Sequence, residues 1–172
     1  RAGHGIQRTI TAVLAARLRA LNAQVAAHPA GEDRPARDMP PARISLDFPK
    51  KISFDWRAFL PVLPFFEGFD EDERDELASI GRALEIARGD WLFAAGAPAS
   101  ACYLVLRGAL EIFVASKDKE RRVAIAGPGE LVGYMAVING APRANHARAR
   151  EACALLELPR DAFIALYEGN SG

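Results

Sequence analysis

Gly133 and Arg143 have the types and the spacing of an anion-binding site. Gly133 precedes residues 134–138, which have the pattern of a short helical turn, and the loop 139–142 leads to Arg143 at the head of a predicted strand. The first N–H groups of a helix have no partner within the helix, so they attract anions such as phosphate. An arginine adds a planar, permanently charged group that binds phosphate oxygens in pairs. This stretch therefore predicts a phosphate site made by a backbone turn and one arginine.

Arg143 also has a purely structural interpretation. Two carboxylates that are close in sequence, Glu130 and Glu151, could pair with it and leave no charge for a ligand. Both interpretations stay open at this point. The loop length and the helix start favour the anion site.

The chain lacks the common sequence signatures of catalysis. Its three histidines, His4, His28 and His146, are too scattered to predict one preformed metal site. His146 alone is a weak signal for a haem ligand. No nucleophile elbow, Walker loop or dinucleotide fingerprint occurs. We therefore expect a protein that is not an enzyme, with no catalytic residue, no metal and no cofactor.

Composition limits the partners that we expect. Among the 172 residues, 22 basic side chains balance 22 acidic ones, so no net charge attracts the chain to nucleic acid or membranes. We interpret Arg143, Arg148 and Arg150 as the polar face of a strand rather than as a nucleic-acid surface. No apolar run approaches the roughly 20 residues of a membrane-spanning helix. Cys102 and Cys153 lie among apolar residues, as expected for buried free thiols in a reducing, cytoplasmic location.

Residues 1–28 and 29–58 precede the predicted β domain. Apolar residues at spacings of three and four in 6–27 predict an amphipathic helix, whose apolar face packs on its own chain or on a second copy. The second segment is a proline-rich linker, since seven of the eleven prolines lie in residues 29–64. The aromatic residues near the end of this stretch are expected to dock on the domain. Because the chain begins with Arg1, we expect it to be part of a longer protein.

The spacing of apolar residues changes from helical to alternating near Leu84. Before this point, Asp70 is the predicted N-cap of a helix, and Glu73 completes a capping box. Beyond it, short alternating runs separated by glycine turns predict strands at 84–88, 91–94, 102–107, 109–115, 122–126, 143–150 and 151–158. The chain is therefore predicted to be mainly β with flanking α: an antiparallel β jelly-roll barrel with N-terminal helices and a short helix before Arg143.

The order of these turns, together with the run around Arg143, resembles the cyclic-nucleotide-binding domain family. The runs 132–137 (Val-Gly-Tyr-Met-Ala-Val) and 142–146 (Pro-Arg-Ala-Asn-His) are similar to that family's phosphate-binding cassette in loop length and in several residue types. Matches before and after the cassette assign residues 59–172 to such a domain. The resemblance implies a non-catalytic regulatory domain whose ligand is cAMP or cGMP. The implied ligand-binding residues are Gly133, Tyr134, Met135, Ala136, Arg143, Ala144, Asn145 and His146.

Two positions depart from the family's cassette. Tyr134 replaces the glutamate that binds the ribose 2′-hydroxyl, and His146 replaces a small hydroxyl residue. We therefore expect weak or absent binding of cyclic AMP, and tighter binding in the variant Tyr134→Glu. The alternative is a degenerate domain that has lost nucleotide binding and serves as a protein-interaction or dimerisation module.

The resemblance also bears on partners. It implies an effector domain in the same longer protein. Since domains of this family usually end in a helix, residues 1–28 could also be the tail of a preceding domain. We expect the family's helix that caps the purine to be truncated or absent here. A homodimer would form through the predicted helix at residues 6–27. No helix-turn-helix follows the predicted barrel, so we expect no nucleic-acid contact within this chain.

Overall fold

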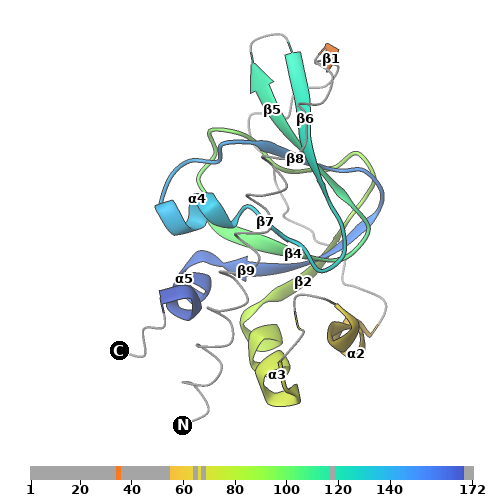
Figure 1. Cartoon of the computed structure of the whole chain (residues 1–172), viewed down its shortest axis with the longest axis vertical. Helices are drawn as coiled ribbons and strands as arrows, with labels where there is room; N and C mark the ends of the chain where they lie inside the picture. Colours follow the sequence, from red (N-terminus) through yellow and green to blue (C-terminus); the bar gives the residue numbers. More distant parts are fainter. Residues whose placement is uncertain (1–33, 36–54, 64–65, 67–68, 117–118, 169–172) are drawn as a thin grey trace.

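The computed structural model describes residues 34–35, 55–63, 66, 69–116 and 119–168 (Figure 1). The helix predicted for residues 6–27 and most of the proline-rich linker lie outside the described residues. The same holds for the side chain of Glu73 in the predicted capping box. The proposed division of the chain at residues 28 and 58 therefore stays a prediction.

Two antiparallel sheets form the body of the described chain (Figure 1). In spatial order, the five-stranded sheet contains β1 (Arg34–Pro35), β6 (Lys119–Ala126), β5 (Leu110–Ser116), β8 (His146–Ala149) and β3 (Trp91–Phe93). The four-stranded sheet contains β2 (Arg82–Ile86), β9 (Cys153–Pro159), β4 (Ala101–Arg107) and β7 (Leu131–Val132). Strands that are distant in sequence lie side by side, such as β5 with β8 and β2 with β9. This arrangement confirms the predicted mainly β jelly-roll fold.

Alternation along the strands places apolar side chains between the two sheets. Successive side chains of a strand point to opposite faces, and residues 101–106 of β4 are all buried, so both faces of this strand are covered. Cys102 and Cys153 are buried free thiols, as predicted. The buried residues between the sheets are called the inner cluster: Leu84, Ile86, Leu92, Phe93, Ala101, Tyr103, Val105, Leu110, Ala126, Val132, Ala147, Ala149, Cys153 and Leu155.

Helices cover the other face of β4 and β9. They are α2 (Trp56–Phe59), the short 3₁₀ turn η1 (Leu60–Val62), α3 (Glu71–Ile80), α4 (Tyr134–Asn139) and α5 (Arg160–Glu168). Figure 1 shows α3 and α5 on the same side of the four-stranded sheet. The buried residues of this layer are called the helical cluster: Leu60, Leu63, Phe66, Phe69, Leu77, Ala78, Ala99, Cys102, Leu104, Leu106, Leu131, Tyr134, Val137, Ala154, Leu156, Leu158 and Phe163.

Local sequence explains where the first helices begin. Oδ1 of Asp55 accepts a hydrogen bond from the N–H of Ala58 at 3.3 Å, which caps α2, a helix that the sequence pattern does not predict. The C=O of Asp70 accepts the N–H of Arg74 at 3.0 Å, so α3 begins directly after Asp70, as predicted. The predicted docking of the aromatic segment is confirmed at Phe66, which is 1% exposed.

The seven predicted strands are all present, with ends that differ from the observed ones by at most three residues, whereas β1 and β7 have no predicted counterpart. The correction that matters most is at Arg143, which does not lead a strand, because β8 begins at His146. The N–H of Arg143 donates to the C=O of Ala97, and its C=O accepts the N–H of Gly96, each at 2.8 Å. These bonds hold Arg143 against the loop between β3 and β4 before the ladder of β8 begins.

Candidate functional site

Gly133 is the N-cap residue of α4, in a position that requires glycine. Its φ of 79° and ψ of 12° lie in the left-handed region. A Cβ atom here would lie 2.5 Å from Nη1 of Arg143 and 3.1 Å from Cε1 of Phe93. The conformation disfavours any side chain, and a side chain would also force the guanidinium to move. The glycine lets α4 begin directly beside the Arg143 guanidinium.

The loop between α4 and Arg143 is held at both ends. At its start, Gly140 has a φ of 63°, and the N–H of Ala141 donates to the C=O of Ala136 at 3.1 Å, an ending of the Schellman type. At its end, the backbone of Arg143 is bonded to the residues 96–97. The cassette loop thus fixes where the Arg143 side chain begins.

The Arg143 side chain is buried and binds backbone oxygens. Only 5% of the residue is exposed. Nη1 donates to the C=O of Gly133 at 2.6 Å, and Nη2 donates to the C=O of Ala101 at the start of β4. Cζ lies 4.2 Å from the centroid of the Phe93 ring, within cation–π range. The guanidinium therefore joins the start of α4 to both β4 and β3.

No carboxylate of the described residues forms an ion pair with Arg143. The structural alternative, a pair with Glu130 or Glu151, does not occur in this part of the chain. The Nε–H group is buried and has no hydrogen-bond partner among the described residues. Burial lowers the pKa of the guanidinium below its ordinary value, but an arginine stays charged at neutral pH. A buried cation with an unmet donor is costly, and an anion would supply the missing partner.

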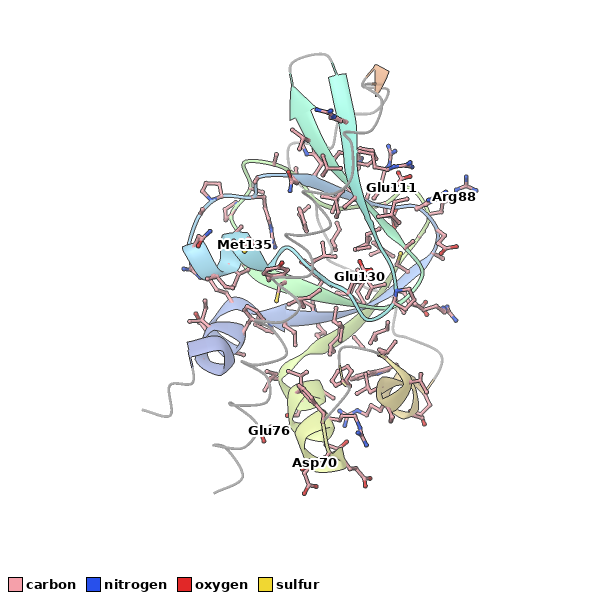
Figure 2. The ribbon with its side chains drawn as sticks, in the orientation of Figure 1. Asp70, Glu76, Arg88, Glu111, Glu130 and Met135 are labelled. Carbon is pink, nitrogen blue, oxygen red and sulfur yellow. The ribbon has the colours of Figure 1, made fainter. Side chains whose placement is uncertain are left out.

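The first side chains of α4 point away from this cation. Tyr134 is 7% exposed and belongs to the helical cluster with Leu104 and Phe163, and burial raises the pKa of its phenol. Met135 is 47% exposed (Figure 2), and Ala136 packs against the helical cluster. The contact of Arg143 with α4 therefore runs through the backbone of the N-cap residue and not through these side chains.

The residues after Arg143 attach the cassette to the five-stranded sheet. Nδ1 of His146 accepts the N–H of Ala95 at 3.0 Å, and its ring lies edge-to-face on Trp91 with centroids 5.9 Å apart. Since Ala147 belongs to the inner cluster, the preceding histidine points to the outer face of the sheet. Residues 144 and 145 are exposed and half-buried, respectively. The structure thus brings Gly133 and Arg143 together, while Tyr134 and His146 lie on other sides of the cassette.

Phe93 is a site residue that the sequence analysis did not single out. It is 8% exposed in the inner cluster, and its ring also stacks on Tyr103, with centroids 6.3 Å apart. Burial raises the pKa of Tyr103, and the nearby Glu157 adds to this rise. Strict alternation along β3 would place Phe93 on the same face as Trp91. The pairing of β3 with β8 is irregular between these two residues, and Phe93 belongs to the inner cluster. Its pairing with an arginine far away in the sequence has no local signal.

The basic residue at 148 does not join Arg143 in a basic patch. Arg148 lies 5.0 Å from the ring centroids of both Trp91 and Phe113, and it pairs with Glu111 at 3.4 Å. Figure 2 places Glu111 on the five-stranded sheet. Among the residues that the structure describes, no three His, Cys, Asp or Glu side chains are grouped to hold a metal ion. No helix in that part of the chain is long and apolar enough to cross a membrane.

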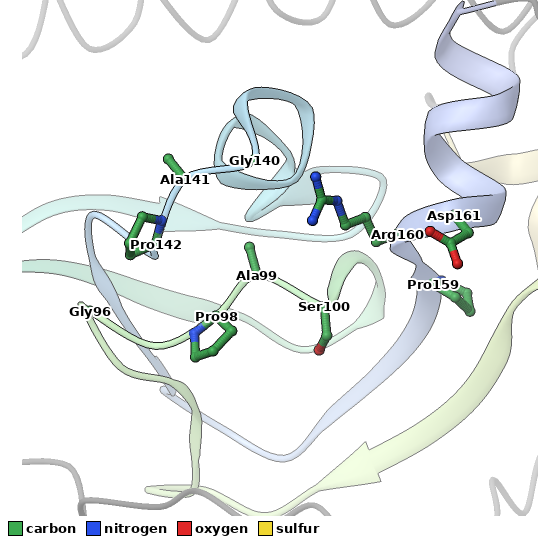
Figure 3. A pocket seen from close by; sticks show the side chains of 10 residues that line it. All are labelled: Gly96, Pro98, Ala99, Ser100, Gly140, Ala141, Pro142, Pro159, Arg160 and Asp161. Carbon is green, nitrogen blue, oxygen red and sulfur yellow. The ribbon is translucent and has the colours of Figure 1, made fainter.

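A surface hollow of about 570 Å³ lies where the cassette loop, the loop before β4 and the start of α5 meet (Figure 3). Two of the residues that line it are bonded to each other, since the N–H of Arg160 donates to the C=O of Ser100 at 2.9 Å. The next residue, Ala101, is paired with Pro159 in the sheet. The start of α5 is therefore attached to the same end of β4 that accepts a hydrogen bond from Arg143.

Three known proteins share sequence with this chain. An uncharacterized NTE family protein of Mycobacterium tuberculosis is 28% identical over 120 residues, covering 70% of this chain and 20% of that protein. The cyclic AMP receptor protein of Thermus thermophilus is 34% identical over 104 residues, covering 60% and 48%. A cAMP-dependent protein kinase regulatory subunit of Aspergillus fumigatus is 31% identical over 111 residues, covering 64% and 26%. This chain spans less than half the length of each relative.

The fold and a family model agree with these likenesses. The crystal structure of the Thermus thermophilus catabolite activator protein matches with a TM-score of 0.55 and 33% identity, over 60% of this chain and 49% of that chain. The family model described as Cyclic nucleotide-binding domain matches residues 83–170, just over half of this chain, and this range includes Gly133 and Arg143. The chain therefore belongs to the cyclic nucleotide-binding domain family, whose domains are regulatory rather than catalytic.

Proposed function

We propose that this chain is a regulatory domain that binds a cyclic nucleotide through the phosphate group at Arg143. The observation that carries the proposal is the environment of this arginine. It is buried and charged, has no acidic partner among the described residues, and has an Nε–H group without an acceptor there. A phosphate, with its several acceptor oxygens, would complete these hydrogen bonds. Two of the matched relatives are named for cyclic AMP, which supports a cyclic nucleotide as the anion.

The geometry leaves donors for such a ligand. A guanidinium has five N–H groups, and Arg143 gives two of them to the carbonyls of Gly133 and Ala101. The remaining groups lie in the same plane and include Nε–H. A phosphate beside Gly133 would also meet N–H groups of the first turn of α4. Because α4 has only six residues, we attribute the binding chiefly to the arginine and not to the helix dipole.

The ribose contributes little in this proposal. Tyr134 holds the position of the family's glutamate, and its side chain belongs to the helical cluster. A hydrogen bond from the 2′-hydroxyl to a carboxylate would be worth about 1.5–3 kcal/mol. Without that bond, affinity is lower by roughly tenfold to a hundredfold. We therefore propose weak binding of cAMP or cGMP, with Met135, Ala136 and residues 144–146 as secondary contacts.

Two connections would carry the effect of binding to the helices. One is the apolar contact of α4 with Phe163 of α5 within the helical cluster. The other is the attachment of Arg160 to the start of β4, where Arg143 also binds. A ligand that moves Arg143 or α4 would thus favour one of two arrangements of α5.

The proposal extends to the rest of the protein. We propose a domain at residues 59–172, a linker at 29–58 and a separate helix at 1–28, in a cytoplasmic protein. The matched relatives are longer than this chain, which supports an effector domain elsewhere in the same protein.

A second candidate is a protein-interaction or dimerisation module without a nucleotide. Tyr134 holds the sequence position at which the family's glutamate would bind a ligand, but its side chain packs in the helical cluster. This packing is the observation in favour of the second candidate. A homodimer through the predicted helix at residues 6–27 belongs to this candidate.

Isothermal titration calorimetry of the purified chain with cyclic AMP and cyclic GMP separates the two candidates. The nucleotide proposal expects measurable binding that is much weaker in Arg143→Lys, because lysine keeps the charge but lacks the planar set of donors. Arg148→Lys is the matched control and should bind like the parent chain. Equal affinity of Arg143→Lys would contradict the phosphate role. No binding by the parent chain at millimolar nucleotide would favour the interaction module.

A further inference from the structure

The Phe93 ring and the Gly133 backbone bound a narrow space that the Arg143 guanidinium fills. Cζ of the arginine lies 4.2 Å from the ring centroid. A methyl group on the glycine would lie 2.5 Å from Nη1 and 3.1 Å from the ring. The ring, the glycine and the guanidinium therefore meet in van der Waals contact, with no room for a side chain at 133.

This space suits a planar cation better than a rounded one. A guanidinium stacks on an aromatic face through its own flat surface and keeps all its N–H groups directed outward in the plane. Here two of these groups point at the carbonyls of Gly133 and Ala101. The ring contact and the two carbonyl acceptors together restrict how the guanidinium lies, and they therefore restrict the direction of Nε–H as well.

A second arginine of this chain has a similar aromatic contact but a different electrostatic partner. Arg148 lies 5.0 Å from the Phe113 centroid and is paired with Glu111 at 3.4 Å. Arg143 has its ring but no carboxylate among the described residues. At Arg148 the carboxylate of Glu111, which is shared with Arg122, pairs with the guanidinium. At Arg143 the Phe93 ring and two backbone oxygens orient the guanidinium, and its charge is left for another partner.

We propose that Phe93 is a positioning residue for anion binding: it holds the Arg143 guanidinium in the orientation in which Nε–H and its neighbours receive a phosphate group. This inference rests on the function proposed above and deepens it, because it names the residue that orients the binding cation. The ring itself touches the arginine and not the anion.

The first readout is spectroscopic and begins with the parent chain. Protons held over an aromatic face are shielded, so the Nε–Hε proton of Arg143, assigned through its loss in Arg143→Lys, should resonate upfield of an ordinary arginine. In Phe93→Leu this shift should disappear, and in Phe93→Tyr, which keeps the ring, it should persist. An unshifted Arg143 signal in the parent chain would overturn the proposal by itself.

Affinity for cyclic AMP provides the second readout. We expect Phe93→Leu to bind about threefold to thirtyfold more weakly than the parent chain. Phe93→Tyr should retain parental binding, and Phe113→Leu, which removes the ring beside Arg148, should not change it. Equal binding by the parent chain and Phe93→Leu would overturn this inference and leave the nucleotide proposal standing. Absence of binding by the folded parent chain would overturn both.

Discussion

The cassette helix α4 is attached to the protein on two sides, and the two attachments differ in kind. On the inner side, Arg143 joins the helix start to β4 and β3 through hydrogen bonds and a ring contact. On the other side, Tyr134 and Val137 join it to the helical cluster through apolar packing. The inner attachment contains a charge that an anion can complete, whereas the helical attachment contains none.

This difference separates binding from communication. In the proposed function, a ligand at the inner side would change the hydrogen bonds of Arg143, and the helical side would pass a movement of α4 to α5 through the cluster that contains Phe163. Under the proposed function, the same difference would let one cassette bind a phosphate without a side-chain contact to the ribose. The side chain at 134 lies on the packing side, and the arginine lies on the side where we propose that the ligand binds.

The largest effect is expected when the inner attachment is removed. Arg143→Ala should weaken nucleotide binding by about 2–5 kcal/mol, because it removes the only charged group proposed to meet the phosphate. It should also lower the free energy of unfolding, since the carbonyls of Gly133 and Ala101 lose their donor. Calorimetry and urea unfolding measure the two effects. Arg148→Ala is the control for loss of an arginine beside an aromatic ring, and it should leave affinity unchanged.

A methyl group at the N-cap of α4 should weaken the inner attachment of this helix. Gly133→Ala requires a left-handed alanine, which costs about 1–2 kcal/mol, and adds a contact of 2.5 Å with the guanidinium. Gly89→Ala is the matched control, because Gly89 has a φ of 87° but nothing within 4 Å of its added Cβ. Urea unfolding should show a greater loss for Gly133→Ala than for Gly89→Ala. Equal losses of unfolding free energy in the two variants would mean that the guanidinium moves aside at no measurable cost.

A charged side chain at position 134 should destabilise the helical attachment. Burial raises the pKa of the Tyr134 phenol, so its surroundings disfavour an anion, and they should raise the pKa of a glutamate placed there. Tyr134→Glu should therefore lose roughly 1–3 kcal/mol of unfolding free energy at pH 7. The protonated acid is tolerated, so the loss should be small below the unfolded pKa of about 4.3 and grow as pH rises through the folded pKa.

Urea unfolding of Tyr134→Glu at several pH values checks this expectation, with Tyr134→Phe as the apolar control. The sequence resemblance alone leads to a different expectation for the same variant, which is tighter binding of cyclic AMP. Parental stability at pH 7 together with increased affinity would show that residue 134 faces the ligand after all.

The smallest effect is expected when the 2′-hydroxyl of the ligand's ribose is removed. If Arg143 carries the binding and the Tyr134 side chain stays in the helical cluster, then 2′-deoxy cyclic AMP should bind within about twofold of cyclic AMP. Competition between the two ligands on the same sample measures this ratio. A tenfold preference for the ribose form would reveal a strong acceptor for the 2′-hydroxyl, as expected for a carboxylate.

Sequence alone predicts much of this architecture, for reasons that particular residues make clear. The short apolar runs of β4 and β9 between turns mark the sheets, and Asp70 marks the start of α3, because these signals are local. Gly133 and Arg143 could be paired in advance, since a short loop of fixed length joins them. The strand predicted from Arg143 begins later, because its backbone is bonded to the distant loop at Gly96.

The rest of the site depends on contacts that have no local pattern. The acceptors of the Arg143 side chain are backbone carbonyls, which every residue has, so nothing in the sequence identifies them. In the sequence, Phe93 looks like an ordinary strand residue. Only the structure shows that the Arg143 guanidinium lies over its ring. The side to which Tyr134 points is set by the packing of α4 on α5, which comes from the tertiary structure.

An NMR titration with cyclic AMP that follows the Nε–Hε signals of Arg143 and Arg148 tests the role of Arg143 most directly. If the phosphate completes the hydrogen bonds of the buried cation, the Arg143 signal will shift saturably. The Arg148 signal, whose guanidinium is paired with Glu111, will stay in place. Saturable binding seen by calorimetry with no change in the Arg143 signal would contradict the assignment of this arginine as the phosphate-binding residue.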